Sequence, residues 1–200
     1  MKPVIITVGR QFGSGGHELG EKLAARLGVP FYDKELLTEA AKRCGLAEDM
    51  VKHLDEKPTS SFLYALSIGS TGYNGDVTMP LGNQVFLAMA QAIKDIADEG
   101  SCVIVGRCAE YVLADREELV SVFVHADKDA RVKRIMEKRQ LTEREASVLI
   151  QKTDKRRAGY HDFYCDDKWG AAATYDLTVN SAAFGIDAAV DMIASYIEKR

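Results

Sequence analysis

The sequence has 200 residues, of which 46% are hydrophobic, enough for the core of one α/β domain with a small insert. Its formal net charge of −4 argues against a general nucleic-acid binder, whose surface is usually basic, but allows a local cluster that binds a nucleotide. No apolar run approaches the roughly 20 residues of a membrane span, and the first apolar run is too short for a signal peptide.

The four cysteines, Cys44, Cys102, Cys108 and Cys165, lie far apart in the sequence and form no C-x-x-C pair. This spacing does not favour zinc binding or redox use, and reduced core thiols are the preferred interpretation. We therefore expect a cytoplasmic protein. The histidines His53, His125 and His161 show no ligand spacing, and we assign them no role.

The amino-terminal segment predicts a strand, a glycine loop and a helix in that order. The apolar run Val4–Val8 is followed by Gly9–His17, and an amphipathic run covers residues 18–27. Glycines let consecutive backbone N–H groups point at one anion, and the helix dipole adds to the attraction. A tight turn that needs glycine for packing alone is the alternative. Four glycines within eight residues favour phosphate binding.

The loop departs from both common glycine fingerprints. Glu18 stands at the third glycine of G-x-G-x-x-G. In the pattern G-x-x-x-x-G-K-[ST], with Gly15 as the second glycine, Arg10 stands at the first glycine, Gly16 at the lysine and His17 at the hydroxyl. Arg10 is therefore a candidate to replace the missing positive charge.

Strands and helices alternate along the rest of the chain, which predicts a parallel sheet with helices on both faces. The predicted strands after the first are Val29–Tyr32, Cys102–Val105, Leu119–Val124 and Leu177–Val179. The predicted helices are Lys34–Cys44, Ala47–Glu56, Gln84–Asp98 with Asn83 as its cap, Asp127–Arg139, Thr142 to about Ala158, and Ile186–Lys199. A Ser-, Thr- and Gly-rich break covers 58–82, and 159–173 is predicted to be irregular. A loop as long as the first of these is usually functional or disordered.

Charged residues at element ends are the remaining candidates for chemistry. Arg107 follows the apolar strand Cys102–Val105, where ligands bind in open α/β sheets, although a surface salt bridge is the alternative. Asp33 ends the second strand, where it binds substrate or caps the next helix. Arg131 and Arg134 share one helix face, which is either functional or simply solvated.

A basic run follows later in the chain. Asp154 precedes Lys155, Arg156 and Arg157, just before the aromatic-rich stretch. Phosphoryl transfer spreads negative charge over the phosphate oxygens, so a lid that delivers such cations suits that reaction. A basic helix end favoured by the helix dipole is the alternative.

Together these segments resemble the cytidylate kinase-like branch of the P-loop nucleoside monophosphate kinases, over essentially the whole chain. The sequence is similar to the subgroup with Gly-Ser-Gly-Gly in place of Gly-Ser-Gly-Lys, here Gly13–Gly16. The family's Gly-Arg-Asp run appears as Gly106-Arg107-Cys108, so its acidic member is lost. Asp154 and Arg157 match the second half of the lid motif R-D-x-x-D-x-x-R. Tyr32-Asp33 matches a Tyr-Asp pair, and Asn180-Ser181 matches the turn beside the adenine.

The resemblance implies a three-layer P-loop NTPase fold with a five-stranded parallel sheet, a monophosphate-binding insert at about 36–82 and a lid at about 150–172. It implies ATP and Mg²⁺ as cofactors, with no metal ligand identifiable in the sequence. The candidate catalytic residues are Arg10, Lys155, Arg156 and Arg157. The candidate ATP-binding residues are Gly13, Ser14, Gly15, Gly16, His17, Asn180 and Ser181. The candidate acceptor-binding residues are Asp33, Arg107, Arg131 and Asp154.

The predicted function is phosphoryl transfer from ATP to a nucleoside monophosphate, with CMP or dCMP as the leading acceptor. A non-catalytic nucleotide or phosphate sensor is the alternative, because the P-loop lysine and hydroxyl are missing. A kinase of another small molecule is a third hypothesis. We expect small-molecule nucleotide partners, no nucleic-acid polymer and no membrane, and the sequence leaves the oligomeric state open.

Overall fold

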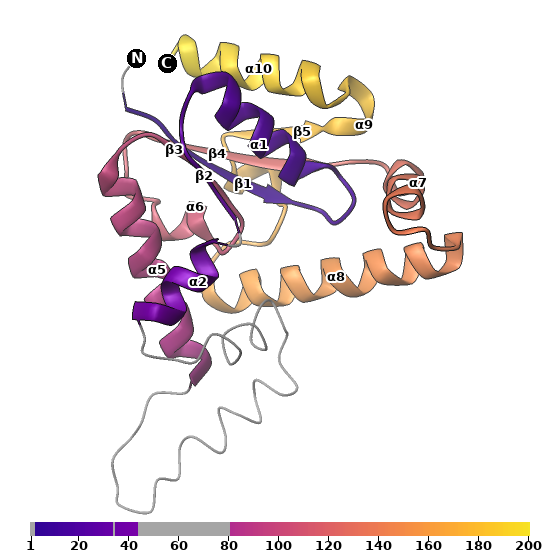
Figure 1. Cartoon of the computed structure of the whole chain (residues 1–200), viewed down its shortest axis with the longest axis horizontal. Coiled ribbons are helices and arrows are strands. Elements are labelled where there is room, and N and C mark those ends of the chain that lie inside the picture. The colour runs from indigo at the N-terminus through magenta and orange to yellow at the C-terminus, as the bar shows by residue number, and fades with distance from the viewer. Residues whose placement is uncertain (1–2, 34, 44–80) are drawn as a thin grey trace, which may run out of the picture.

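A computed structural model describes residues 3–33, 35–43 and 81–200, which form a five-stranded parallel sheet with helices around it (Figure 1). The strands are β1 (Ile5–Arg10), β2 (Phe31–Tyr32), β3 (Cys102–Val105), β4 (Leu119–His125) and β5 (Leu177–Asn180). Their order is β2-β3-β1-β4-β5, so β1 is central. Val8 of β1 pairs with Val105 of β3 and Val122 of β4. The glycine loop therefore leaves the sheet from its centre, between the carboxyl ends of β3 and β4.

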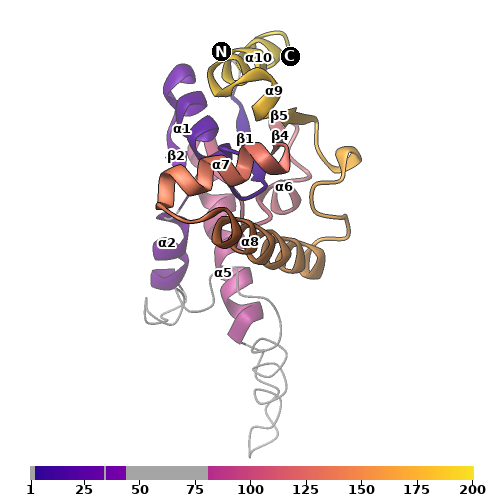
Figure 2. The ribbon, with the colours of Figure 1, turned by 90° about the vertical axis from the view of Figure 1, so that its right-hand side faces the viewer.

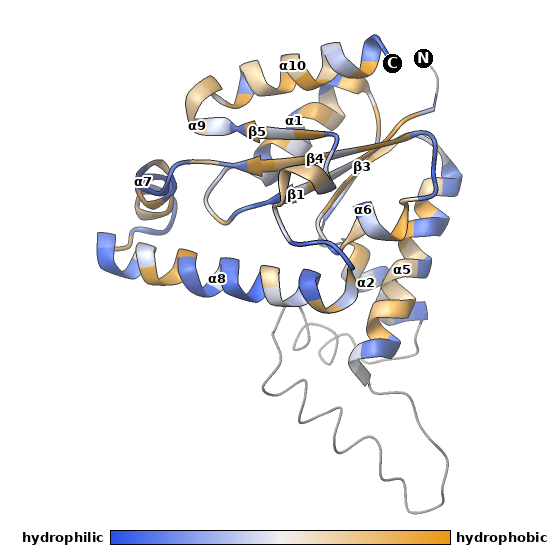
Figure 3. Cartoon of the chain, turned by 180° about the vertical axis from the view of Figure 1, so that it is seen from behind, coloured by the Kyte–Doolittle hydropathy of each residue, from blue (hydrophilic) through white to orange (hydrophobic). Residues whose placement is uncertain are grey.

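The two faces of the sheet are covered by different helices. On one face, α1 (Gly16–Leu27) and α10 (Ile186–Glu198) pack against alternate residues of β1, such as Ile6 and Val8. On the other face, α2 (Glu35–Arg43), α5 (Leu81–Glu99) and α6 (Ala109–Val112) pack around Ile5 and Ile104. β3 is continuously apolar because both of its faces are buried, and it is orange in Figure 3.

Two long helices follow β4 and lie beside the glycine loop. They are α7 (Lys128–Arg139) and α8 (Glu143–Tyr164), and they face the viewer in Figure 2. Val132 and Ile135 of α7 pack against Ala146 and Ile150 of α8. Thr142 begins α8 with a reciprocal capping box to Glu145. The short elements η1 (Ala172–Thr174) and α9 (Ser181–Phe184) complete the chain order.

The parallel sheet with helices on both faces is confirmed, and the strand Cys102–Val105 has the predicted bounds. Two helix boundaries are wrong. The helix expected at Gln84–Asp98 begins at Leu81, and Asn83 lies inside it, where its side-chain oxygen accepts from the Tyr164 hydroxyl at 3.4 Å. This tertiary contact replaces the expected cap.

The second error concerns the segment predicted to be irregular from residue 159. Its first six residues continue α8 to Tyr164, and the ring of Tyr164 stacks on Phe86 of α5 with centroids 3.9 Å apart. Aromatic packing between α5 and α8 therefore extends the helix. The expected helix Ala47–Glu56, and the insert at 36–82 apart from its ends, lie outside the described residues. Among the described helices, none is both long and apolar enough to cross a membrane.

Candidate active site

The glycine loop joins β1 to α1 at the carboxyl edge of the sheet. Gly13 and Gly15 both have φ of 82°, a left-handed conformation that glycine adopts without steric cost. Gly15 is the residue preceding α1, and no side chain caps the helix there. The first N–H groups of an α-helix have no partner within the helix. An anion bound at this helix start would therefore meet uncapped N–H donors and the positive end of the helix dipole.

Hydrogen bonds from two serine hydroxyls to backbone carbonyls stabilise the glycine loop. The buried hydroxyl of Ser14 donates to the carbonyl of Gln11 at 2.8 Å, and Ser181 donates to the carbonyl of Ser14 and, at 3.3 Å, to that of His125. Asn180 caps α9 by accepting from Ala182 and Ala183. The side chains of Ser14, Asn180 and Ser181 are thus engaged by the fold. Any contact of these residues with a nucleotide stays a prediction.

Arg10 lies across two glycines. A Cβ on Gly16 would lie 2.5 Å from the Cβ of Arg10, and one on Gly106 would run into the Arg10 guanidinium. The guanidinium reaches toward Asp33, with 4.0 Å between Nη2 and Oδ1. Glycine at residues 16 and 106 is therefore what allows the Arg10 side chain to lie between the loop and the end of β3.

Asp33 also lies close to the imidazole of His17 at this edge of the sheet. Its carboxylate is buried and lies 3.3 Å from Nε2 of His17, whose side chain is 55% exposed. Asp33 thus faces both Arg10 and His17. The arrangement places one carboxylate beside the glycine loop, within reach of a ligand that enters from solvent past His17.

Arg134 of α7 lies over the glycine loop. Its guanidinium takes the space that a side chain on Gly15 would need. Its Nη1 atom is buried and has no hydrogen-bond partner among the described residues. A buried donor atom without a hydrogen-bond partner is costly, so this position favours a bound anion. The only sequence signal for Arg134 was its place on the helix face of Arg131.

Asp154 and Arg131 fasten the loop to α7 and α8. The Asp154 carboxylate accepts from the backbone N–H of Phe12 at 2.7 Å and pairs with Nη1 of Arg131 at 2.5 Å. Arg157 adds a third tie, because its Nη1 donates to the carbonyl of Arg10 at 3.1 Å. Arg157 and Arg139 also lie over the ring of Phe12, at 5.7 and 5.3 Å from its centroid. In this state, the predicted lid motif therefore contacts the glycine loop itself.

Arg107 stands in a turn of unusual backbone geometry. Gly106, Arg107 and Cys108 have φ of 77°, 64° and 55°, and such values are uncommon outside glycine. Strain of this kind clusters at functional sites. Arg107 is 7% exposed and lines a small cavity with Arg10, Arg157 and other residues. Three predicted arginines from distant parts of the sequence thus share one cavity.

The wall of this cavity also contains an acid–base pair that the sequence did not indicate. Nε2 of His161 lies 3.1 Å from Oε1 of Glu110, and both residues are buried. Burial lowers the pKa of His161, but hydrogen bonds to Cys165 and Glu110 outweigh it and raise that pKa to about 10. The imidazolium is therefore favoured at neutral pH. No local spacing links these residues, so only the fold reveals the pair.

The other two predicted lid cations also belong to α8. Lys155 is exposed and Arg156 is half-buried, and their contact with a ligand stays a prediction. Within the described ranges, no group of three or more His, Cys, Asp or Glu side chains could hold a metal ion. The Mg²⁺ ligands thus stay unassigned.

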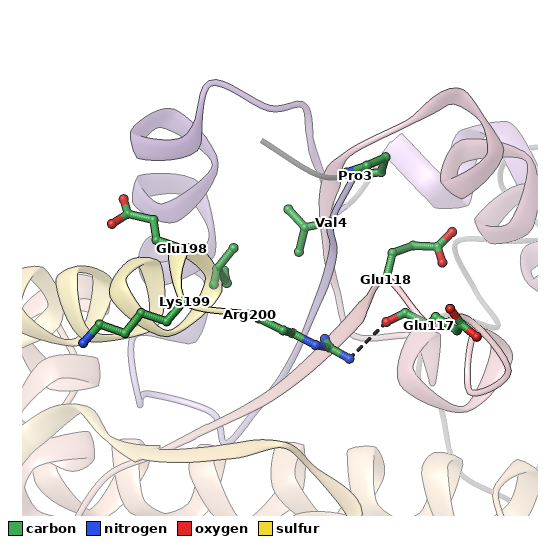
Figure 4. A pocket seen from close by; sticks show the side chains of 8 residues that line it. Pro3, Val4, Glu117, Glu118, Glu198, Lys199 and Arg200 are labelled. Carbon is green, nitrogen blue, oxygen red and sulfur yellow. Dashed lines mark hydrogen bonds between the residues drawn. The ribbon is translucent and has the colours of Figure 1, made fainter.

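A second pocket, of about 730 Å³, lies at the opposite edge of the sheet (Figure 4). It is lined by Val4 before β1, Glu118 before β4 and the last residues of the chain, where Arg200 Nη2 donates to the carbonyl of Glu117 at 3.0 Å. Ligands of open parallel sheets bind at the carboxyl ends of the strands. This pocket lies at the amino ends, so we do not assign the function to it.

The sheet order and the glycine loop after its central strand define the P-loop kinase class of fold. The cytidylate kinase-like family matches residues 5–183, and the chain belongs to this family. An uncharacterised protein of Eubacterium ventriosum has 34% identity and a TM-score of 0.74, over 98% of this chain and 99% of that one.

Two more distant solved structures share the fold. Shikimate kinase of Bacteroides thetaiotaomicron has 14% identity and a TM-score of 0.57, over 98% of each chain. A gluconokinase of Sinorhizobium meliloti has 18% identity and a TM-score of 0.52, over 98% of this chain and 95% of that one. No curated protein sequence matches the chain significantly.

Proposed function

We propose that the protein transfers a phosphoryl group from ATP to a small phosphorylated acceptor, with a nucleoside monophosphate, CMP or dCMP, as the leading candidate. The observation that carries this proposal is the buried, unpartnered Nη1 of Arg134 against Gly15, at the uncapped start of α1. A triphosphate would satisfy both the guanidinium and the N–H groups of residues 13–17.

Arg10 supplies the charge that a P-loop lysine gives in other kinases. Its side chain starts beside Gly16, at the place where a lysine would start. One electrostatic contact of this kind is worth about 10²–10³ in rate, so its loss without replacement would be severe. Moving the cation from residue 16 to residue 10 keeps it at the same edge of the sheet.

Mg²⁺ would enter with the nucleotide. It usually binds through phosphate oxygens, water and one or two carboxylates rather than through a complete protein cage. His17, in place of the usual hydroxyl, is a poor ligand for this hard ion. We therefore expect the phosphates and water to provide most of its coordination, and we assign no protein ligand.

The acceptor's phosphate would bind beside the loop, where the cavity of about 20 Å³ would have to widen as the lid opens. Arg107 and Arg157 line it, and a phosphate monoester is the ligand that paired guanidinium groups recognise best. Asp33 faces the same edge from β2. Lys155 and Arg156 would join from the lid when ligands are bound, and Arg131 and Asp154 would hold the loop in place.

Release of ADP from ATP and Mg²⁺ tests the proposal, with a panel of nucleoside monophosphates as acceptors. We expect turnover with at least one cytidine monophosphate. Folded protein that turns over none of the panel would overturn the nucleotide kinase. Shikimate and gluconate belong in the same panel, because the structurally similar kinases carry those names and Asp33 is a carboxylate placed to accept a hydroxyl proton.

A non-catalytic nucleotide sensor is the second candidate. The close approach of Arg10 to Gly16 favours this sensor, because it leaves no room for a lysine at residue 16. Without that lysine, α1 offers no side-chain cation to the phosphates of a bound nucleotide. Calorimetry separates the two functions. Binding of ATP without turnover of any acceptor supports the sensor, and the absence of nucleotide binding contradicts both.

A further inference from the structure

The turn after β3 and the end of α8 lie against each other. Two contacts join them: the ion pair between Glu110 and His161 at 3.1 Å, and the hydrogen bond from the Tyr111 hydroxyl to Asp166 at 3.5 Å. Cys108 precedes the first members of these pairs, and Cys165 lies between the second members. The two cysteines are thus brought together by contacts on both sides of them.

Cys108 and Cys165 are free thiols, and each side chain lies close enough to the other to shift its pKa. Both are buried, at 4% and 7% exposure, and Cys108 lines the cavity that Arg107 also lines. Buried free thiols are what the sequence predicts, but the spacing of the cysteines does not indicate that these two lie together. The described cysteine Cys102 lies elsewhere, in β3, among the apolar residues under α5.

The surroundings favour the thiolate form of one member of the pair. Hydrogen bonds from Cys108 and His161 outweigh the opposite effect of burial and lower the pKa of Cys165 to about 7, despite the nearby Glu110 carboxylate. The pKa of the Cys108 thiol is raised by its bond to Cys165 and by burial. A thiolate beside a protonated thiol is the arrangement from which a disulfide forms.

We propose that Cys108 and Cys165 are a redox pair that a peroxide converts to a disulfide, which fastens the end of α8 to the turn that carries Arg107. The Cys165 thiolate attacks one peroxide oxygen and becomes a sulfenic acid, and the other oxygen leaves as water after taking up a proton. The Cys108 sulfur then attacks the sulfenic sulfur, and its proton and the hydroxyl leave as a second water. Two thiols are oxidised and one peroxide is reduced to two waters.

The bond would restrain the residues that form the acceptor cavity. Arg107 precedes Cys108, and α8 carries Arg157 toward the glycine loop. Kinase lids must open and close around their ligands. Oxidation would thus slow turnover, and a thiol reductant would restore it. The disulfide does not depend on the proposed function, but this effect on turnover rests on it.

The direct test is peptide mass mapping after treatment with hydrogen peroxide and alkylation in denaturant. A Cys44→Ser background removes the cysteine that lies outside the described residues. We expect a cross-linked peptide joining Cys108 and Cys165, loss of both alkylated forms, and full alkylation of Cys102. Dithiothreitol should restore alkylation at both positions. Absence of the cross-link in folded, peroxide-treated protein would overturn the proposal.

Variants and a pH profile keep the test independent of folding defects. Cys108→Ser and Cys165→Ser should each abolish the cross-link, and Cys102→Ser should not. In the unsubstituted pair, the cross-linking rate should rise through about pH 7, where the Cys165 thiolate forms among the titratable groups of Cys108, His161, Glu110, Tyr111 and Tyr175. A rate that rises only near the ordinary thiol pKa would contradict Cys165 as the attacking group.

Stability and activity then separate the two parts of the proposal. The oxidised protein should unfold at a temperature roughly 5–10 °C higher than the reduced protein, because a long loop is closed. ADP release should fall at least tenfold on oxidation and return on reduction. Unchanged turnover in fully cross-linked protein would overturn the locking role. If the reduced protein shows no turnover, this result contradicts only the proposed kinase activity. The presence or absence of the cross-link still tests the proposed disulfide.

Discussion

The Cβ of Arg10 occupies the space that a side chain on Gly16 would need, because a Cβ at residue 16 would lie 2.5 Å from it. In sequence the two residues look like two separate losses, at the first glycine and at the lysine of a P-loop. In the fold they are linked, because a side chain at residue 16 would collide with that of Arg10. This contact supports the proposal that Arg10 replaces the cation missing from the start of α1.

This contact predicts coupled effects on stability. Gly16→Ala should lower the free energy of unfolding by about 1–3 kcal/mol, because the clash involves atoms close to the backbone that cannot simply rotate away. In an Arg10→Gly background the same change should cost less than half as much. Urea unfolding of the two single variants and the double variant measures the coupling, and strictly additive effects would contradict it.

The tie between Asp154 and the loop predicts a second stability effect. Asp154→Ala leaves the N–H of Phe12 and the guanidinium of Arg131 without their shared acceptor. We expect a loss of about 1–3 kcal/mol in denaturant unfolding. Asp191→Ala is the matched control, because its ion pair with Arg26 is exposed and should contribute less than about 1 kcal/mol. Equal effects of the two changes would remove the special role of Asp154.

Arg107 should matter for ligand binding more than for folding. Arg107→Ala should weaken acceptor or phosphate binding about tenfold or more, because a charge-assisted contact is lost. Circular dichroism checks that the fold is kept, and calorimetry measures the affinity. Arg116→Ala, on the surface beside Asp98, serves as the control. Unchanged affinity in Arg107→Ala would exclude Arg107 from the site.

The ion pair of His161 and Glu110 predicts a pH-dependent contribution to stability. The pKa of His161 is raised in the folded protein from 6.5 to about 10, so its stabilisation is complete below pH 6.5 and is lost as the pH rises through 10. The stability difference between the reduced wild-type protein and His161→Gln should therefore shrink, by about 4 kcal/mol, between about pH 6 and pH 10. A difference that stays constant across this range would contradict the charged pair.

Much of the architecture could be predicted from local patterns, because buried strands and capped helices leave local signatures. The strand Cys102–Val105 is apolar throughout and follows Gly100, and Thr142 begins α8 as its pattern suggests. Strand ends meet at one edge of a parallel sheet. Arg10 ends β1 and Arg107 follows the neighbouring strand β3, so this rule predicts that both lie at the same edge of the sheet.

The parts of the site that the sequence does not reveal depend on contacts between residues distant in sequence. Neither the pair Cys108 and Cys165 nor the pair Glu110 and His161 has a spacing that indicates contact, since α8 reaches them only through its packing on the loop and on α5. In the sequence, Arg134 stands out only because it shares a helix face with Arg131. Its position over Gly15 became visible once α7 was placed against the loop.

The central claim is that the glycine loop and Arg134 bind the phosphates of ATP, and calorimetric titration with ATP and Mg²⁺ tests it most directly. We predict binding by the wild-type protein and at least tenfold weaker binding by Arg134→Gln, because a charge-assisted contact is lost. The stability of that variant should not fall, since its buried Nη1 has no hydrogen-bond partner among the described residues. Lys133→Gln, an exposed change on the same helix, should bind ATP like the wild type. No binding by the wild-type protein, or equal affinities of wild type and Arg134→Gln, would contradict the claim.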